Sequence, residues 1–231
     1  MSFYFYLNLA IIAFPLVFSF ERRIKFYKRF RALVVALLIV GVFFVSWDVF
    51  ATYRGDWSFN PAYVNEVKVL GLPLEEILFF ITVPYSCLFV FDAMGHFFED
   101  KKLFNPKKWV PLIIAGLVIL SAFVFYGQEY TFLGILSVGL TILFVTLVNV
   151  QLFSSRSYWI YTFLTLVLFL IFNYILTSYP VVEYSSNAIT GIRMLTIPIE
   201  DFMFNFSMLT GYLGVYLWAL KKFRIGTSVS L

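Results

Sequence analysis

Two pairs of adjacent acidic residues stand at the head of long apolar stretches, in "LPLEEILFF" and "IPIEDFMFN". The pairs are Glu75–Glu76 and Glu200–Asp201. A carboxyl group in an apolar cavity can keep its proton near neutral pH and act as a general acid, and a second carboxylate can take a proton back. Aromatic faces can stabilise a cation between these two events. This chemistry suits the rearrangement of an isoprenoid alkene through a carbocation.

The acidic pairs belong to an internal repeat with an offset of 125 residues. The segment "VKVLGLPLEEILFF" (67–80) aligns without a gap on "IRMLTIPIEDFMFN" (192–205). At the same offset Asp48 falls on Asn173. We therefore expect both acidic pairs at one depth, where they would line a single cavity between the two halves.

A purely structural explanation competes with this interpretation. Acidic residues in the first turn of a helix interact well with its positive end, and proline suits a helix start. One acidic pair would be explained in this way. Two pairs in matching contexts, each followed by phenylalanine, favour a functional role.

Helical geometry separates the members of each pair, because adjacent residues point about 100° apart. The face of Glu75 continues with Thr82 and Ser86, and small or polar residues mark helix–helix contacts in membranes. We predict that Glu75 and Glu200 point inward, whereas Glu76 and Asp201 support them from the pocket wall. Further candidates for substrate binding or cation stabilisation are Phe79, Phe80, Phe204, Asn205, Trp57, Asp48, Asn173 and Asn8.

The elements that must position these residues are membrane helices. The chain of 231 residues is 61% hydrophobic and 13% charged, with a mean hydropathy of +0.89. Soluble domains carry roughly twice that charged fraction. The apolar blocks predict an all-α integral membrane protein with seven transmembrane helices, near 3–20, 32–53, 74–97, 109–127, 129–152, 157–179 and 195–219.

Positive charge predicts the orientation of these helices. Fourteen of the 17 Lys and Arg residues lie after the first, third, fifth and seventh helices. The positive-inside rule then places the N-terminus outside and the C-terminus in the cytoplasm. The repeat predicts two parallel three-helix units joined by a linker helix (3+1+3), with boundaries at 1–98, 99–127 and 128–231. The first helix lacks the basic start and the cleavage site of a signal peptide.

Several other classes of site are not supported by the sequence. Cys87 and His96 are single representatives of their types, so a disulfide within the chain and a usual zinc or haem site are not expected. Glycine-rich nucleotide or flavin fingerprints are also missing. We expect no metal and no cofactor. The net charge of +4 indicates membrane topology and contact with anionic lipids, with no need for nucleic acid.

The doubled Pro-x-Glu-Glu/Asp motif in a seven-helix chain resembles the membrane-integral lycopene β-cyclases, with their two subunits fused into one chain. The resemblance covers about 1–220 and maps the motif acids onto Glu75, Glu76, Glu200 and Asp201. It implies an intramolecular lyase or isomerase that closes the ψ ends of lycopene to β rings, through γ-carotene to β-carotene. It also implies a multi-pass location in a bacterial cell membrane, lycopene drawn from the bilayer, and other carotenoid enzymes as partners. Oligomeric state is left open.

The resemblance leaves some choices open. Asn205 stands where the first half has Phe80, which suggests that the halves do unequal work. The first choice for the donor is Glu75 or Glu200, with the other pair taking the final proton. A cyclase that makes ε or γ rings, or acts on longer carotenoids, stays possible. A small-solute transporter shares the 3+1+3 layout but lacks the Pro-Gln signature here, and a retinal protein would need a lysine within 195–219.

Overall fold

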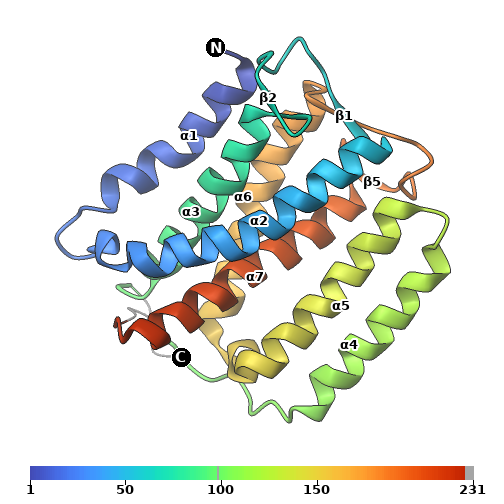
Figure 1. Ribbon diagram of the computed structural model, residues 1–231. Helices are drawn as coiled ribbons and strands as arrows, with labels where there is room; N and C mark the ends of the chain where they lie inside the picture. The colour runs from blue at the N-terminus through green and yellow to red at the C-terminus, as the bar shows by residue number, and fades with distance from the viewer. Residues whose placement is uncertain (98, 227–231) are drawn as a thin grey trace.

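The computed structural model describes residues 1–97 and 99–226, which form a bundle of seven α-helices (Figure 1). The helices are α1 (Phe3–Phe18), α2 (Phe30–Arg54), α3 (Leu74–Met94), α4 (Trp109–Ala122), α5 (Glu129–Asn149), α6 (Arg156–Ser178) and α7 (Ile199–Phe223). Short 3₁₀ turns precede α2 and follow α4 and α5, at Phe26–Arg29, Phe123–Phe125 and Val150–Ser154. The prediction of a predominantly helical fold is confirmed.

Four helical segments are long and apolar enough to cross a membrane: Phe26–Arg54, Leu74–Met94, Glu129–Ser154 and Arg156–Ser178. The segments Phe3–Phe18 and Trp109–Phe125 are shorter apolar helices. Many large apolar side chains face outward, among them Phe14, Leu38 and Phe163. Such a surface suits lipid contact. The predicted orientation across a membrane stays a prediction.

Local chemistry explains where several helices begin and end. The Ser2 and Ser155 hydroxyls cap α1 and α6 by accepting backbone N–H groups of Phe5 and Tyr158. Gly55, with a φ of 84°, ends α2 in the left-handed conformation that glycine adopts most easily.

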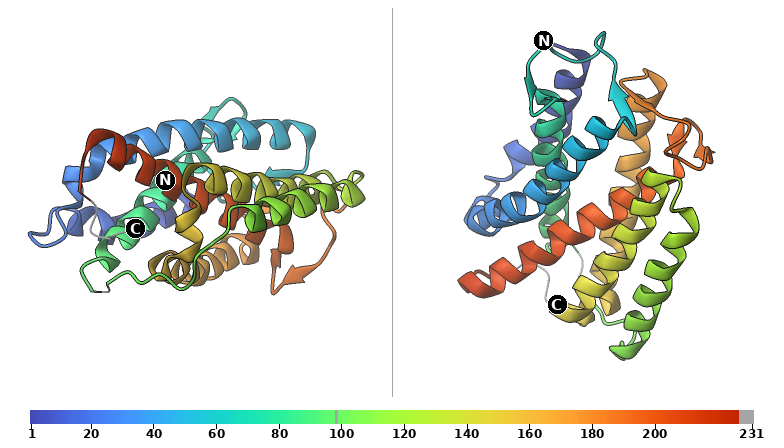
Figure 2. Two further views of the ribbon diagram at one scale, coloured as in Figure 1. Left: turned by 90° about the horizontal axis from the view of Figure 1, so that it is seen from below. Right: turned by 45° about the vertical axis from the view of Figure 1, so that its right-hand side comes forward.

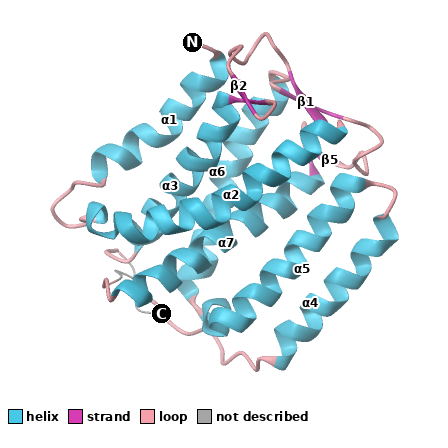
Figure 3. Cartoon of the chain, in the orientation of Figure 1, coloured by secondary structure: helices cyan, strands magenta, loops and turns pink. Residues whose placement is uncertain are grey.

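Six short strands gather at one end of the bundle (Figure 3). β2 (Lys68–Val69) and β3 (Leu72–Pro73) form a tight hairpin before α3, and β5 (Arg193–Met194) and β6 (Ile197–Pro198) form another before α7. Leu70 and Leu195 take positive φ at the two turns. The prediction that the last helix begins at 195 is wrong, because this hairpin delays its start to Ile199.

A third strand pair joins distant parts of the chain. β1 (Trp57–Phe59) pairs antiparallel with β4 (Val182–Tyr184), so that Trp57 lies opposite Tyr184. The loop after α2 is therefore tied to the loop after α6. This strand pair closes the end of the bundle at which α3 and α7 begin (Figures 1 and 3).

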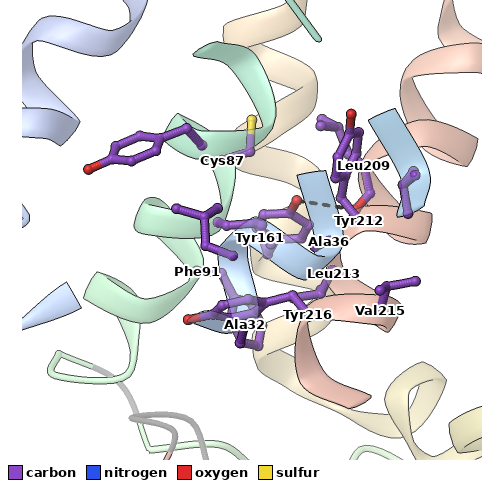
Figure 4. Close-up of a cluster of buried hydrophobic side chains, with 14 of the residues drawn as sticks. Ala32, Ala36, Cys87, Phe91, Tyr161, Leu209, Tyr212, Leu213, Val215 and Tyr216 are labelled. Carbon is purple, nitrogen blue, oxygen red and sulfur yellow. Dashed lines mark hydrogen bonds between the residues drawn. The ribbon is translucent and has the colours of Figure 1, made fainter. Parts of the chain in front are cut away.

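The core is rich in tyrosine and lies around α7. This helix packs against α2 and α5, and α3 packs against α1 and α2 (Figure 2). Tyr161, Tyr212 and Tyr216 are buried with Phe91 and Leu213 in one cluster (Figure 4). Tyrosine suits a helix bundle of this kind because its hydroxyl bonds a neighbouring helix: that of Tyr212 donates to a carbonyl oxygen on α3 at 3.0 Å.

α4 lies at the periphery and packs along α5 (Figure 1). The approach is close at Gly139, where a Cβ atom would lie 2.6 Å from the Ile119 side chain. α4 contributes no side chain to the cavity described below.

Candidate active site

An apolar cavity near the strand-bearing end of the bundle contains three carboxyl groups, each from a different helix. Asp48 comes from α2, Glu76 from α3 and Asp201 from α7, and all three are buried. The cavity volume is about 130 Å³. Its aromatic lining consists of Tyr4, Phe44, Trp47, Trp57, Phe59, Phe79, Phe80, Tyr130, Phe169, Tyr184 and Phe204.

Glu76 and Asp48 form a pair of interacting carboxyl groups. The Tyr4 hydroxyl donates to Glu76 Oε2 at 2.8 Å. The Trp57 indole donates to Asp48 Oδ1 at 2.8 Å, and the Thr52 hydroxyl donates to the same oxygen at 3.3 Å. Asp48 Oδ2 is buried and has no hydrogen-bond partner among the described residues. The Asp48 and Glu76 carboxyl groups are near enough to influence each other electrostatically.

Asp201 lies in a different environment. Its Oδ1 accepts a hydrogen bond from Tyr130 at 2.6 Å, and its Oδ2 accepts bonds from Tyr184 at 2.7 Å and Asn173 at 2.9 Å. Burial, and next the charge of Asp201, raise the pKa of the Tyr184 phenol well above its ordinary value, so Tyr184 keeps its proton and donates. Three donors on two oxygens match an ionised carboxylate, which only accepts hydrogen bonds.

The prediction that Glu75 and Glu200 point into the shared space is wrong. Neither residue lines the cavity, although both are fully buried. Glu75 Oε1 accepts from the Ser2 hydroxyl and from the Asn65 backbone and side chain. Glu75 therefore holds the loop that contains Asn65 against the start of α1.

Glu200 makes the corresponding contacts in the second half. Its Oε1 accepts from the Thr131 hydroxyl at 2.6 Å, the Thr190 backbone N–H at 2.8 Å and the Thr190 hydroxyl at 2.9 Å. In each glutamate the second oxygen is buried and has no partner among the described residues. The inward acids are thus Glu76 and Asp201, the reverse of the expected division.

Most of the other predicted site residues do line the cavity. Asn8 does not line it. Its amide donates to the carbonyl oxygens of Tyr4 and Glu75, and its Oδ1 accepts from Thr82, so it joins α1 to α3. The predicted residues that line the cavity are Phe79, Phe80, Phe204, Asn205, Trp57, Asp48 and Asn173, together with Glu76 and Asp201.

Sequence reasoning missed the three tyrosines that bind the inward carboxylates, Tyr4, Tyr130 and Tyr184. A signal was present for two of them. Tyr4 lies in the first turn of α1 and Tyr130 in the first turn of α5, so both belong to the same end of the bundle as the acidic pairs. Tyr184 carried no such signal, because it reaches Asp201 only through the pairing of β4 with β1.

Stacked aromatic rings form the wall beside Asp201. The rings of Tyr130 and Phe204 are parallel within 16° with centroids 4.9 Å apart. Trp57 meets Tyr130 edge-on at 4.9 Å, and Trp47 lies 5.6 Å from Phe204. Such faces can stabilise a cation formed in the cavity. Among the described residues, no three His, Cys, Asp or Glu side chains are arranged to hold a metal ion.

Comparison with known sequences identifies the family. The sequence profile described as "Lycopene cyclase" matches residues 1–94 and 127–219, which is most of the chain. The chain belongs to the lycopene cyclase family. Asp48, Glu76 and Asp201 all lie within the matched stretches of this cyclase-family chain.

A fungal protein is also similar. The bifunctional lycopene cyclase/phytoene synthase of Neurospora crassa is 25% identical over 144 residues, which cover 56% of this chain. The match spans 22% of the length of that protein. No solved structure matches this cyclase-family chain significantly.

Proposed function

We propose that this chain is a lycopene β-cyclase, an isomerase that converts the ψ ends of lycopene to β rings without a cofactor. The observation that carries the proposal is the presence of two chemically different carboxyl sites in one aromatic cavity. The Asp48–Glu76 pair is one, and Asp201 with its three donors is the other. Acid–base chemistry needs two titratable groups kept in different environments.

The Asp48–Glu76 pair is the proton donor in this proposal. A proton held by the pair gives the unpartnered Asp48 Oδ2 a role, since that oxygen can then carry or share it. Protonation at C2 of a ψ end leaves a cation at C1. The C5=C6 double bond attacks C1, which forms the C1–C6 bond and moves the cation to C5.

Asp201 is the base in this proposal. It takes the proton from C6, and the electrons of that C–H bond form the new C5=C6 double bond of the β ring. One proton enters and one leaves, so the product is an isomer of the substrate. The stacked faces of Tyr130 and Phe204 beside Asp201 suit the intermediate cation. Return of the proton from Asp201 to the pair resets the site.

The membrane setting completes the proposal. Lycopene dissolves in lipid, and the helices have apolar outer surfaces. We propose a multi-pass protein with its N-terminus outside and its C-terminus in the cytoplasm, in which the units 1–98 and 128–231 flank the linker 99–127. The acidic cavity then lies toward the outer side, at the depth of the strand pairs.

Expression in lycopene-accumulating bacteria, followed by chromatography of the pigments, tests the function. The unaltered chain should convert red lycopene to γ-carotene and β-carotene. Unchanged lycopene would reject the cyclase proposal. Products with ε or γ rings would keep the cyclisation but reject loss of the C6 proton. Glu76→Gln and Asp201→Asn should each stop conversion, whereas full activity in both would reject the assigned residues.

A further inference from the structure

A long apolar groove leads away from the acidic cavity between α1, α3 and α6. We call it the α1–α3–α6 groove. It shares five lining residues with the cavity, so the two spaces lie side by side. The shared residues are Phe79, Phe169, Asn173, Leu176 and Asn205.

Three polar side chains along the groove, Ser86, Thr165 and Asn173, already make hydrogen bonds. The Ser86 hydroxyl donates to the carbonyl oxygens of Thr82 at 2.7 Å and Ile11 at 3.0 Å. The Thr165 hydroxyl donates to the Thr162 carbonyl at 3.1 Å. The groove therefore offers few free hydrogen-bonding groups to an occupant, and its remaining walls are aliphatic and aromatic. This surface suits a hydrocarbon and is poorly suited to a sugar or an ion.

A second groove lies between α2, α5 and α7, and its lining is related to the first by the 125-residue offset. Val215 lines it where Val90 lines the first groove, and Phe204 and Phe44 correspond to Phe79 and Phe169. It meets the acidic cavity through three bulky aromatic residues, Phe44, Trp47 and Phe204.

The two grooves differ where they meet the cavity. On the α1–α3–α6 side the boundary includes Asn205, which lines both spaces. The residue at the equivalent position of α3 is Phe80, whose larger ring lines the cavity but not the second groove. Phe80 is buried and lies edge-on to Phe79 at 5.8 Å. The smaller Asn205 thus leaves more room at its boundary than a phenylalanine would.

We propose that the unreacted arm of the linear carotenoid lies in the α1–α3–α6 groove while its end group reacts in the acidic cavity. The proposal rests on the proposed cyclase function and adds the direction of the bound chain. Along α3 the groove runs from Phe79 to Val90, which is about 16 Å at the rise of an α-helix. Phe14 at its margin is 61% exposed, so the groove can receive its occupant sideways from the lipid.

Two matched substitutions test this assignment. Val90→Trp fills the far end of the α1–α3–α6 groove, and Val215→Trp makes the same change at the equivalent position of the second groove. Conversion of lycopene should fall about 100-fold in Val90→Trp, because the end group can no longer reach the acids. Val215→Trp should keep the activity of the unaltered chain. The measurement is the initial rate of ring formation by purified protein.

A shorter acyclic isoprenoid with the same ψ end group separates blockage from misfolding. Its chain should end before Val90, and Val90→Trp should then cyclise it as fast as the unaltered chain does. If Val90→Trp does not fold, Leu168→Trp on the α6 wall replaces it, with Phe43→Trp as its equivalent in the second groove.

Equal activity of a matched pair on lycopene, with the unaltered chain active, would overturn the groove assignment and leave the cyclase function standing. An unaltered chain that leaves lycopene unchanged would overturn the function itself.

Discussion

The neighbouring acids Glu200 and Asp201 should respond very differently to the same chemical change. Glu200→Gln and Asp201→Asn each replace one carboxyl oxygen by an amide nitrogen. Glu200 fixes the loop through Thr131 and Thr190 and does not line the cavity, whereas Asp201 does. We expect Glu200→Gln to keep its turnover and Asp201→Asn to lose it.

The cost in stability should be similar for the two variants. Each carboxylate accepts three hydrogen bonds. A hydrogen bond contributes roughly 1 kcal/mol, so disturbing three of them should cost about 3 kcal/mol in either variant. For a chain of this size that lowers the melting temperature by about 6 to 12 °C. The turnover of Asp201→Asn should also fall by roughly 10²- to 10⁴-fold, the usual contribution of a general base.

Each variant therefore serves as the stability control for the other. Thermal unfolding in detergent gives the two melting temperatures, and chromatography of the carotenoids gives initial rates per folded protein. The same experiment applies to the first half with Glu75→Gln against Glu76→Gln.

The reasoning fails if Glu200→Gln loses as much turnover as Asp201→Asn while both variants stay folded. In that case Glu200, and by analogy Glu75, would take part in proton transfer. It also fails if Asp201→Asn retains full activity, because the three hydrogen-bond donors would then serve packing alone.

Three further predictions concern the donor pair and the scaffold. Asp48→Asn should lower the rate of cyclisation by about 100-fold, since the amide cannot share a proton with Glu76; a rate equal to that of the unaltered chain would contradict the pair. Gly139→Leu should lower the free energy of unfolding by about 1–3 kcal/mol, because the new side chain overlaps Ile119. The rate of cyclisation per folded protein should not change, because α4 is remote from the cavity. Tyr216→Phe should lower the free energy of unfolding by about 1–3 kcal/mol, because it removes a hydrogen-bond donor to buried Asp92. The ratio of carotenoid products in chromatography should not change. An unaltered melting temperature would argue against this hydrogen bond.

The helices could be predicted from the sequence because apolar blocks of sufficient length have few alternatives in lipid. The start of the last helix could not. The segment 193–198 is apolar enough to continue the helix, but Pro198 is the extended N-cap residue of α7 and pairs with Arg193 in a hairpin. Strands of two residues carry no periodicity that a sequence pattern could reveal.

The division of each acidic pair was predicted in reverse for a physical reason. The small and polar stripe after Glu75 is a helix–helix contact, as expected, but its partner is α1. Thr82 donates to Asn8 at 2.7 Å and Ser86 to the Ile11 carbonyl. The acid on that stripe is therefore buried against α1 and its loop, while its neighbour Glu76 faces the other half.

The same relation holds in the second half. Ser207, on the face of Glu200, accepts a hydrogen bond from Ser137 of α5 at 2.9 Å. The stripe marks packing within a half, and the sequence alone does not say which neighbour a packed face meets. A polar stripe thus predicts burial of an acid without predicting access to a cavity.

An enzyme that both gives and takes a proton needs two carboxyl groups that differ. Positions related by the 125-residue offset supply the same backbone twice. Pro73 and Pro198 have nearly identical dihedral angles, and the second acid of each pair that follows them lines one cavity. The difference arises at the offset pair Asp48 and Asn173. Asp48 brings a second carboxyl group near Glu76, and on the proposed mechanism that pair stores the proton. Asn173 brings an amide donor to Asp201, so that site is suited to a bare carboxylate. On the proposed mechanism, a one-atom difference between aspartate and asparagine separates proton donor from base on an otherwise repeated scaffold.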